Sequence, residues 1–111
     1  MTLVESRLKR HHFQRAACRA LRVDNAVPLL GRAEELEPSP HASVVAQAVA
    51  RPELALALMV PWLGPGGVAV LPGAATPPDA SDPRVHLERI TRYRVPCGGP
   101  ERTLWIGRVA G

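Results

Sequence analysis

Two runs of small and branched apolar residues place the strongest constraint on the fold of this chain. Ser43–Ala46 and Val68–Leu71 show no alternation of apolar and polar residues. A strand with one face toward water alternates, whereas a strand covered on both faces in a parallel sheet reads as a continuous apolar run. We therefore expect an α/β protein in which a parallel sheet is covered by helices.

The remaining elements follow in an order typical of that class. The other expected strands are Thr2–Glu5, Ala26–Leu30, Arg84–Val95 and Arg102–Val109. One helix should run from the N-cap Ser6 to about Arg22, and a second should cover Glu53–Leu63 with Pro52 in its first turn. The first four strands should be parallel, and the last two should form an antiparallel hairpin across Pro96–Pro100.

Prolines and glycines mark the edges and turns of this layout. Pro28 has no backbone N–H, which favours an edge position for its strand. Arg32–Leu36 reads as a compact polar turn, Gly64–Gly67 should end the second helix, and Ala74–Pro83 reads as a loop.

Helical spacing predicts which side chains are buried. The first helix should place a set of apolar residues on or near one face: Leu8, Phe13, Ala16, Ala17, Ala20 and Leu21. In the second helix, Leu54, Leu58 and Trp62 recur at every fourth position. Because only four residues are aromatic, the core must consist mainly of Ala, Val and Leu.

The length and the apolar stretches exclude several classes of protein. A chain of 111 residues corresponds to one domain, so we expect residues 1–111 to form a single one. The longest apolar stretch, Leu54–Leu63, is too short to cross a bilayer and contains Pro61, and no apolar signal segment follows Met1. We expect a cytoplasmic protein with no membrane contact.

The cysteines and histidines do not predict a metal site. Cys18 and Cys97 lie far apart outside any Cys/His cluster, so we expect two free thiols and no bound metal. We expect all four histidines at the surface; they are His11, His12, His41 and His86.

Charge is distributed unevenly along the chain. Residues 1–22 have a net charge of +5, residues 23–83 of −5 and residues 84–111 of +4. Basic ends around an acidic middle suggest a polyanion-binding rim beside a site for a small molecule. Thirteen of the fourteen cations are Arg, which suits phosphate contacts, although the codon usage of a GC-rich genome explains the same bias.

The first helix concentrates this positive charge. Its basic residues recur every three or four positions, which stacks them into a stripe: Arg7, His11, Arg15, Arg19 and Arg22. Two interpretations remain open, a solvated helix face and a nucleic-acid contact.

Three segments of the chain resemble one known family. The runs TLVESRLKRHHFQRAACRALRVDNAVPLLGRAEEL, VVAQAVARPELALALMVPWLGPGGVAVLPG and ITRYRVPCGGPERTLWIGRV are similar in order and spacing to the ribosomal RNA small-subunit methyltransferase G family, also called glucose-inhibited division protein B. The resemblance covers nearly the whole chain. It implies a partial class I S-adenosylmethionine-dependent methyltransferase sheet, Rossmann-like, without its first strand and with a C-terminal antiparallel hairpin.

The resemblance also implies an activity and a set of binding residues. The activity is transfer of a methyl group from S-adenosylmethionine to N7 of a guanine in small-subunit ribosomal RNA. Glu5 matches the acid on the ribose hydroxyls, Ala33 and Glu34 match the pair beside the adenine, and Gln47 stands where the family has an Arg near the cofactor. The basic residues that we expect to contact RNA are Arg7, Lys9, Arg10, Arg15, Arg92 and Arg94, with Arg84, Arg89, Arg102 and Arg108 as further candidates.

No catalytic residue is predicted. A neutral N7 lone pair needs no general base, so catalysis would depend on holding donor and acceptor in line and on excluding water. The absence of an acid/base pair in the sequence is therefore compatible with this chemistry.

The chain departs from the family pattern at its start and at two positions. It begins at the family's second strand, so the first strand and its Gly-rich turn are missing. In addition, Pro72 stands where the family usually has a Lys, and Gln47 stands where it has an Arg. Loss of a central strand should leave two half-sheets with unpaired edges or force these to pair directly. Three explanations remain open: a start further upstream, a catalytically inactive remnant that binds RNA or a partner, and a fragment completed by a second chain.

Overall fold

The computed structural model describes residues 1–46, 51–73 and 75–111. They form two compact units, residues 1–37 and 38–111, each described here by itself. The first unit consists of β1 (Thr2–Glu5), α1 (Leu8–Ala20) and β2 (Val27–Leu30). The second consists of β3 (His41–Val45), α2 (Pro52–Met59), the 3₁₀ helix η1 (Val60–Trp62), β4 (Leu63–Gly73), β5 (Val85–Arg94) and β6 (Glu101–Val109). The single domain expected from the length stays a prediction.

In the first unit, β1 and β2 pair in parallel, with Thr2 opposite Val27 and Glu5 opposite Leu30. This confirms both expected strands, the second beginning one residue later than predicted. Among the described residues β2 pairs only with β1, so the edge position inferred from Pro28 is confirmed. Helix α1 forms the connection between the two strands.

The ends of α1 differ from the prediction. The N-cap is Arg7 rather than Ser6, and it makes no side-chain capping bond; instead its N–H donates to the Glu5 carboxylate at 3.0 Å. The helix ends at Ala20, before the expected Arg22. Arg22 takes a left-handed conformation, with φ at 54°, and Val23 N–H donates to the Cys18 carbonyl at 2.8 Å. This is the bonding pattern of a Schellman motif, which ends the helix without a glycine.

The predicted apolar face of α1 was wrong. Phe13 and Leu21 are each 74% exposed, and the buried residue is His11, with 8% of its area exposed. The expectation that His11 lies at the surface is therefore also wrong. The connection from β1 is only two residues long and its Arg7 N–H is bound to Glu5, which sets the rotation of the helix about its axis. Helical periodicity could not supply that rotation.

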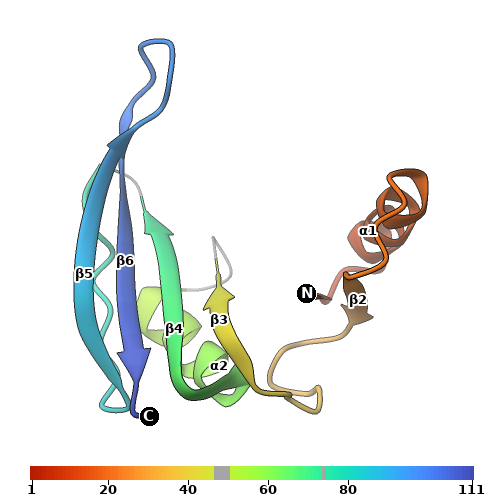
Figure 1. Ribbon diagram of the computed structural model, residues 1–111, viewed down its shortest axis with the longest axis horizontal. Helices are drawn as coiled ribbons and strands as arrows, with labels where there is room; N and C mark the ends of the chain where they lie inside the picture. Colours follow the sequence, from red (N-terminus) through yellow and green to blue (C-terminus); the bar gives the residue numbers. More distant parts are fainter. Residues whose placement is uncertain (47–50, 74) are drawn as a thin grey trace. The chain divides into compact units, whose positions relative to one another are not determined.

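In the second unit, four strands form one sheet in the order β3, β4, β6, β5. Strand β3 runs parallel to β4, and β6 is antiparallel to both β4 and β5. Figure 1 shows the long β5–β6 hairpin and α2 packed behind β4. The predicted hairpin is confirmed: Val95 N–H donates to Pro100 O at 3.1 Å. The described residues thus contain two sheets, one of two strands in the first unit and one of four strands in the second.

Helix α2 and strand β4 have other bounds than expected. The α-helix stops at Met59 and continues as η1, because Pro61 lacks the N–H that the next α-helical hydrogen bond would need. Strand β4 is then longer than the predicted Val68–Leu71, since it starts at Leu63, which pairs with His41 of β3. The Gly-rich run is thus part of the strand, not a stop between helix and strand.

The core of the second unit lies between α2 and the sheet. Its buried members are Ala55, Leu56, Met59, Ala69, Leu71 and Trp105. Leu54, expected on the buried face, is 49% exposed, whereas Leu56 is fully buried and Trp62 is 5% exposed. The prediction for α2 was therefore wrong at Leu54 and right at Trp62. The described part of the loop, residues 75–83, contains no helix or named strand, as predicted.

Candidate nucleoside-binding edge and basic surfaces

Glu5 and the turn after β2 lie next to each other at one sheet edge. The Gly31 N–H donates to the Glu5 carbonyl at 2.9 Å, and Glu5 is opposite Leu30 at the ends of two parallel strands. The carboxyl ends of parallel strands are where open α/β sheets bind ligands. Two segments that are separated by α1 in the sequence therefore meet at the edge where a nucleoside would be expected.

The turn itself is compact. The Arg32 carbonyl accepts hydrogen bonds from Glu35 N–H at 2.9 Å and from Leu36 N–H at 3.1 Å. Gly31 has φ at +152°, and a Cβ there would lie 2.8 Å from Cδ2 of Leu36. Glycine is thus required for Leu36 to fold back over the chain. The turn presents Ala33 half-buried and Glu34 exposed.

The Glu5 side chain is oriented by the N-cap residue of α1, the helix that follows β1. It is half-buried, and its Oε1 accepts the Arg7 N–H at 3.0 Å. An ionised carboxylate has about four acceptor sites, so this bond leaves capacity for two hydroxyl groups. Such a group suits the vicinal diol of a ribose.

Gln47 and Pro72 are the two positions at which the chain departs from the family pattern. Gln47 lies outside the described residues. Pro72 is half-buried in β4, opposite Leu104 of β6, and has no N–H or charged group to offer. The structure therefore brings together Glu5, Ala33 and Glu34 from the predicted set.

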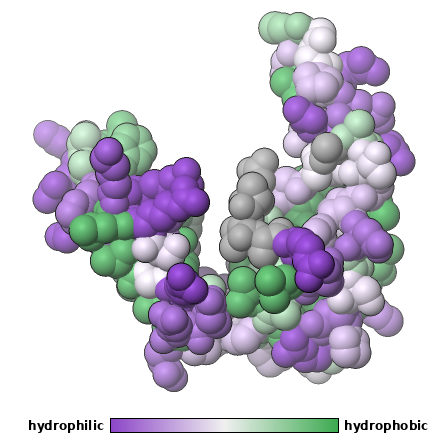
Figure 2. Space-filling view, turned by 180° about the vertical axis from the view of Figure 1, so that it is seen from behind, coloured by the Kyte–Doolittle hydropathy of each residue, from purple (hydrophilic) through white to green (hydrophobic). Residues whose placement is uncertain are grey.

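The predicted RNA-binding residues are exposed in both units. Arg7, Lys9, Arg10 and Arg15 belong to the first unit, and Arg92 and Arg94 lie on β5 in the second. Hydrophilic residues, in purple, cover much of the first unit at the left of Figure 2, with green patches among them. Arg92 Nη1 also donates to the Ala75 carbonyl at 3.2 Å.

Two further arginines are engaged within the chain. Arg84 donates to both carboxylate oxygens of Asp82, at 3.0 and 2.8 Å. Arg108 donates to Glu88 at 3.2 Å and to the Gly66 carbonyl at 2.8 Å. These interactions stabilise the second unit and leave both guanidinium groups less available for RNA than the exposed cations of α1.

A shallow depression of about 360 Å³ lies on α1, lined by His12, Arg15, Ala16 and Arg19. Its residues are separated by three or four positions, so they share one side of the helix. From the sequence, His12 is expected only as a surface histidine. Its spacing from Arg15 and Arg19 was the signal that groups it with them.

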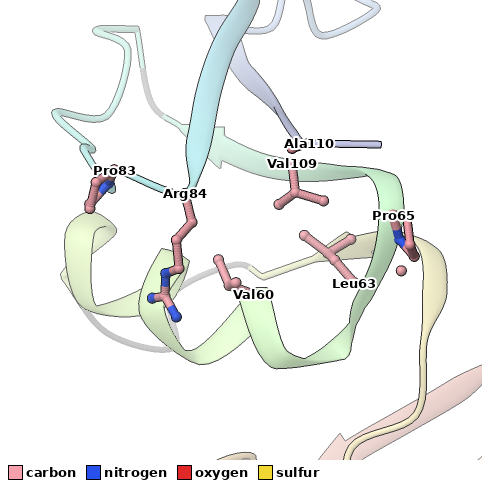
Figure 3. Close-up of a pocket in the computed structure, with 8 residues that line it drawn as sticks. Val60, Leu63, Pro65, Pro83, Arg84, Val109 and Ala110 are labelled. Atoms are coloured by element: carbon pink, nitrogen blue, oxygen red, sulfur yellow. The ribbon is translucent and has the colours of Figure 1, made fainter.

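A second depression, of about 440 Å³, lies in the other unit (Figure 3). Leu63 and Val109 lie beside each other in it, and Arg84 lies at one side (Figure 3). Its lining residues come from the start of β4 and the end of β6. The depression therefore lies at the amino end of the parallel pair β3 and β4. Neither depression is lined by Glu5, Ala33 or Glu34.

The described residues contain no group of three or more His, Cys, Asp or Glu that could hold a metal ion. Cys18 is half-buried, Cys97 is exposed, and both are free thiols. No helix in the described part of the chain is long and apolar enough to cross a bilayer.

Comparison of the sequence with known proteins identifies a relative. The chain is 31% identical to ribosomal RNA small subunit methyltransferase G of Deinococcus deserti over 95% of its own length. It spans 48% of that protein, about half of its length. No protein-family model matches the chain.

Comparison of the structure identifies the fold. A SAM-dependent methyltransferase from Methanosarcina mazei matches with a TM-score of 0.71 at 12% identity, over 98% of this chain and 81% of that one. The N-methyltransferase NodS from Bradyrhizobium japonicum gives a TM-score of 0.67 at 16% identity, over 99% and 73%. M. jannaschii TYW2 in complex with AdoMet gives 0.66 at 11% identity, over 96% and 55%.

These matches confirm the fold and the family resemblance expected from the sequence. The chain is thus similar to ribosomal RNA small subunit methyltransferase G over about half the length of that protein, and its fold is part of the fold of class I S-adenosylmethionine-dependent methyltransferases.

Proposed function

We propose that this chain provides the nucleoside-binding edge and the RNA-binding surface of a cytoplasmic methyltransferase that modifies N7 of a guanine in small-subunit ribosomal RNA. The relative's name supports the RNA substrate. The chain spans about half of that relative, so activity, cofactor and substrate are proposed for this chain from the homology.

The observation that supports this proposal most strongly is the meeting of Glu5 with the turn that contains Ala33 and Glu34. At this edge the Glu5 carboxylate would accept hydrogen bonds from the two ribose hydroxyls. The backbone at Ala33 and the nearby Glu34 would bind the edge of the adenine. The residues present thus fit the nucleoside half of S-adenosylmethionine.

The fit to the other half of the cofactor is weaker. Residues 1–111 contain no Gly-x-Gly-x-x-Gly run to approach the methionine part, and Pro72 provides no donor. We therefore assign this chain only the nucleoside contacts.

The bound cofactor would supply an activated methyl group on a sulfonium. No residue here is assigned as a general base, because a ring nitrogen with a free lone pair loses no proton on methylation. The role of the chain is to hold the cofactor and the RNA in position and to exclude water.

Calorimetry with S-adenosylmethionine tests the proposal. We expect measurable binding by the 111-residue chain, and at least about tenfold weaker binding by Glu5→Gln, because hydrogen bonds to a charged group contribute about 1.5–3 kcal/mol. Since only the nucleoside half is contacted, adenosine should compete with an affinity within a few-fold of that of the cofactor.

Glu35→Gln is the matched control, since Glu35 is an exposed carboxylate in the same turn with no proposed contact. Its affinity should equal that of the parent chain. Equal binding by Glu5→Gln and the parent, or no heat with either ligand, would refute the cofactor site.

A catalytically inactive module that binds RNA is the second candidate. The exposed cations of α1 favour it, because they need no cofactor to attract phosphate. Absence of cofactor heat together with salt-sensitive RNA binding would identify this case.

A second chain that completes the sheet remains part of the proposal. Among the described residues, β1 pairs only with β2, and β3 pairs only with β4. Either strand can accept an added strand on its other edge through backbone hydrogen bonds.

A further inference from the structure

We infer that the exposed face of α1 binds single-stranded RNA, with Phe13 stacking on a base while Arg15, Arg19 and His12 contact phosphates. This inference takes RNA as the partner from the proposed function and names the residues that bind it. The depression on α1 and the exposure of Phe13 are the two observations that support it.

The cations of α1 form a continuous surface without acids. None of the residues of Leu8–Ala20 is acidic. His12, Arg15 and Arg19 line one depression of about 360 Å³. From His12 to Arg19 the helix rises roughly 10 Å, at about 1.5 Å per residue. The three basic side chains are thus spread along about two turns of the helix, so they can contact successive phosphates of one strand.

Phe13 lies beside these cations rather than in the core. Its side chain is 74% exposed. Lys9 and Ala16 precede and follow it by about one turn, and Ala16 is shared with the depression. Because Ala16 is small, a base can stack on the Phe13 ring while the phosphates of the same RNA strand reach Arg15 and Arg19. Aromatic stacking beside a positively charged groove is the general mode of single-strand binding.

The charge of this face favours RNA over an apolar partner, because Leu8–Ala20 contains basic residues and no acid. Leu8, Phe13 and Leu21, the large exposed apolar residues of this segment, are separated by five and eight positions. At about 100° per residue, Leu8 points about 140° away from Phe13, whereas Phe13 and Leu21 differ by about 80° and lie toward one side of the helix. The charge instead complements a polyanion with bases that can stack.

Fluorescence anisotropy with a labelled 12-nucleotide single-stranded RNA tests the inference on the full 111-residue chain at several salt concentrations. Phe13→Leu should weaken binding at least about fivefold with an unchanged salt slope, because a stacked base contributes an affinity independent of counterions. The double variant Arg15→Gln, Arg19→Gln should lower the slope of log affinity against log salt by about 1.4, because each phosphate contact contributes about 0.7.

Matched controls come from the other unit. Tyr93→Leu removes an aromatic ring that is 43% exposed on β5, and Arg51→Gln removes an exposed cation. Both should leave the affinity of the chain for RNA almost unchanged. Phe13→Tyr should restore parental binding, and circular dichroism of every variant should show unchanged helix content.

Three results would overturn the inference. Phe13→Leu or the double arginine variant could bind RNA as the parent does. Heparin, a polyanion without bases, could bind with the same affinity and the same dependence on the substitutions. Vesicles containing phosphatidylserine could be bound in preference to RNA and lose binding with Phe13→Leu, which would assign the face to a membrane.

This experiment is independent of the cofactor test. Glu5→Gln should bind the RNA as the parent does, because Glu5 is outside the α1 face. Failure of cofactor binding with retained Phe13 and arginine effects would refute the methyltransferase proposal and leave this inference standing. The opposite pattern would refute only this inference.

Discussion

Asp82 and Arg84 form a small ion-paired turn at the start of β5. The Asp82 carboxylate accepts hydrogen bonds from the Arg84 N–H at 2.8 Å and from its guanidinium at 3.0 and 2.8 Å. Its carbonyl also accepts the Val85 N–H at 3.0 Å. The guanidinium hydrogen bonds lower the pKa of Asp82 below its ordinary value, although burial opposes this. The Asp82 carboxylate thus holds Arg84, the residue directly before β5, against the preceding loop.

The pH dependence of stability follows from the sign of this shift. Because the pKa of Asp82 is lower in the folded chain than in the unfolded chain, the pair stabilises the fold above about pH 3.9 and loses that contribution as the pH falls through the lowered pKa. The difference in unfolding free energy between the parent and Asp82→Asn should therefore be largest near neutral pH and shrink toward acid. Urea titrations across this range measure it. Asp79→Asn, at an exposed loop position, should show no such trend, and a difference independent of pH for Asp82→Asn would contradict the assignment.

At the scale of single elements, the residues that the helices bury differ from those that their spacing predicted, throughout α1 and at Leu54 of α2. In α1, His11 is buried while Phe13 is exposed; in α2, Leu56 is buried while Leu54 is half exposed. The strands other than β4 were located to within two residues at each end, and Thr2–Glu5 matched at both ends. Helix α2 consists largely of Ala and Leu and has apolar residues on several sides, so its rotation is set by the sheet on which it packs, whereas the short connection from β1 sets that of α1.

Truncation of Leu56 tests this assignment of the buried face. Leu56→Ala should lower the unfolding free energy by about 2–5 kcal/mol, because it leaves a cavity between α2 and the sheet. Leu54→Ala is the matched control in the same helix and should change it by less than about 0.5 kcal/mol. Denaturant unfolding of both variants measures the difference. Equal losses would show that Leu54 is buried after all.

At the scale of the whole molecule, the two units differ in how much they bury. The residues of the hydrophobic core cluster all belong to the unit of residues 38–111. In residues 1–37, His11 is the one residue with less than a tenth of its area exposed, and its Nδ1 has no hydrogen-bond partner among the described residues. A sheet of two short strands with so small a core has little apolar burial to oppose opening.

Hydrogen exchange should therefore distinguish the two units. We expect backbone amides of β1, β2 and α1 to exchange at a lower opening free energy than those of β4 and β6, which are paired on both sides. Exchange measured residue by residue by NMR at neutral pH provides the comparison. The amides of β3 control for the effect of an edge position alone, since β3 is an edge strand in the larger unit. A common opening free energy for all strands would mean that the chain unfolds as one cooperative body.

Local stereochemistry in the sequence by itself determined the order of the elements, the edge strand with Pro28, the Gly31 turn and the closing hairpin. Glycines, prolines and continuous apolar runs act over a few residues, so these features need no distant partner. Tertiary structure alone decided which face of α2 is buried, the extension of β4 to Leu63 and the engagement of Arg108 with Glu88. Each of these features depends on which segments pack or pair with each other. The free energy of that packing and pairing is determined jointly by side chains that are distant in the sequence.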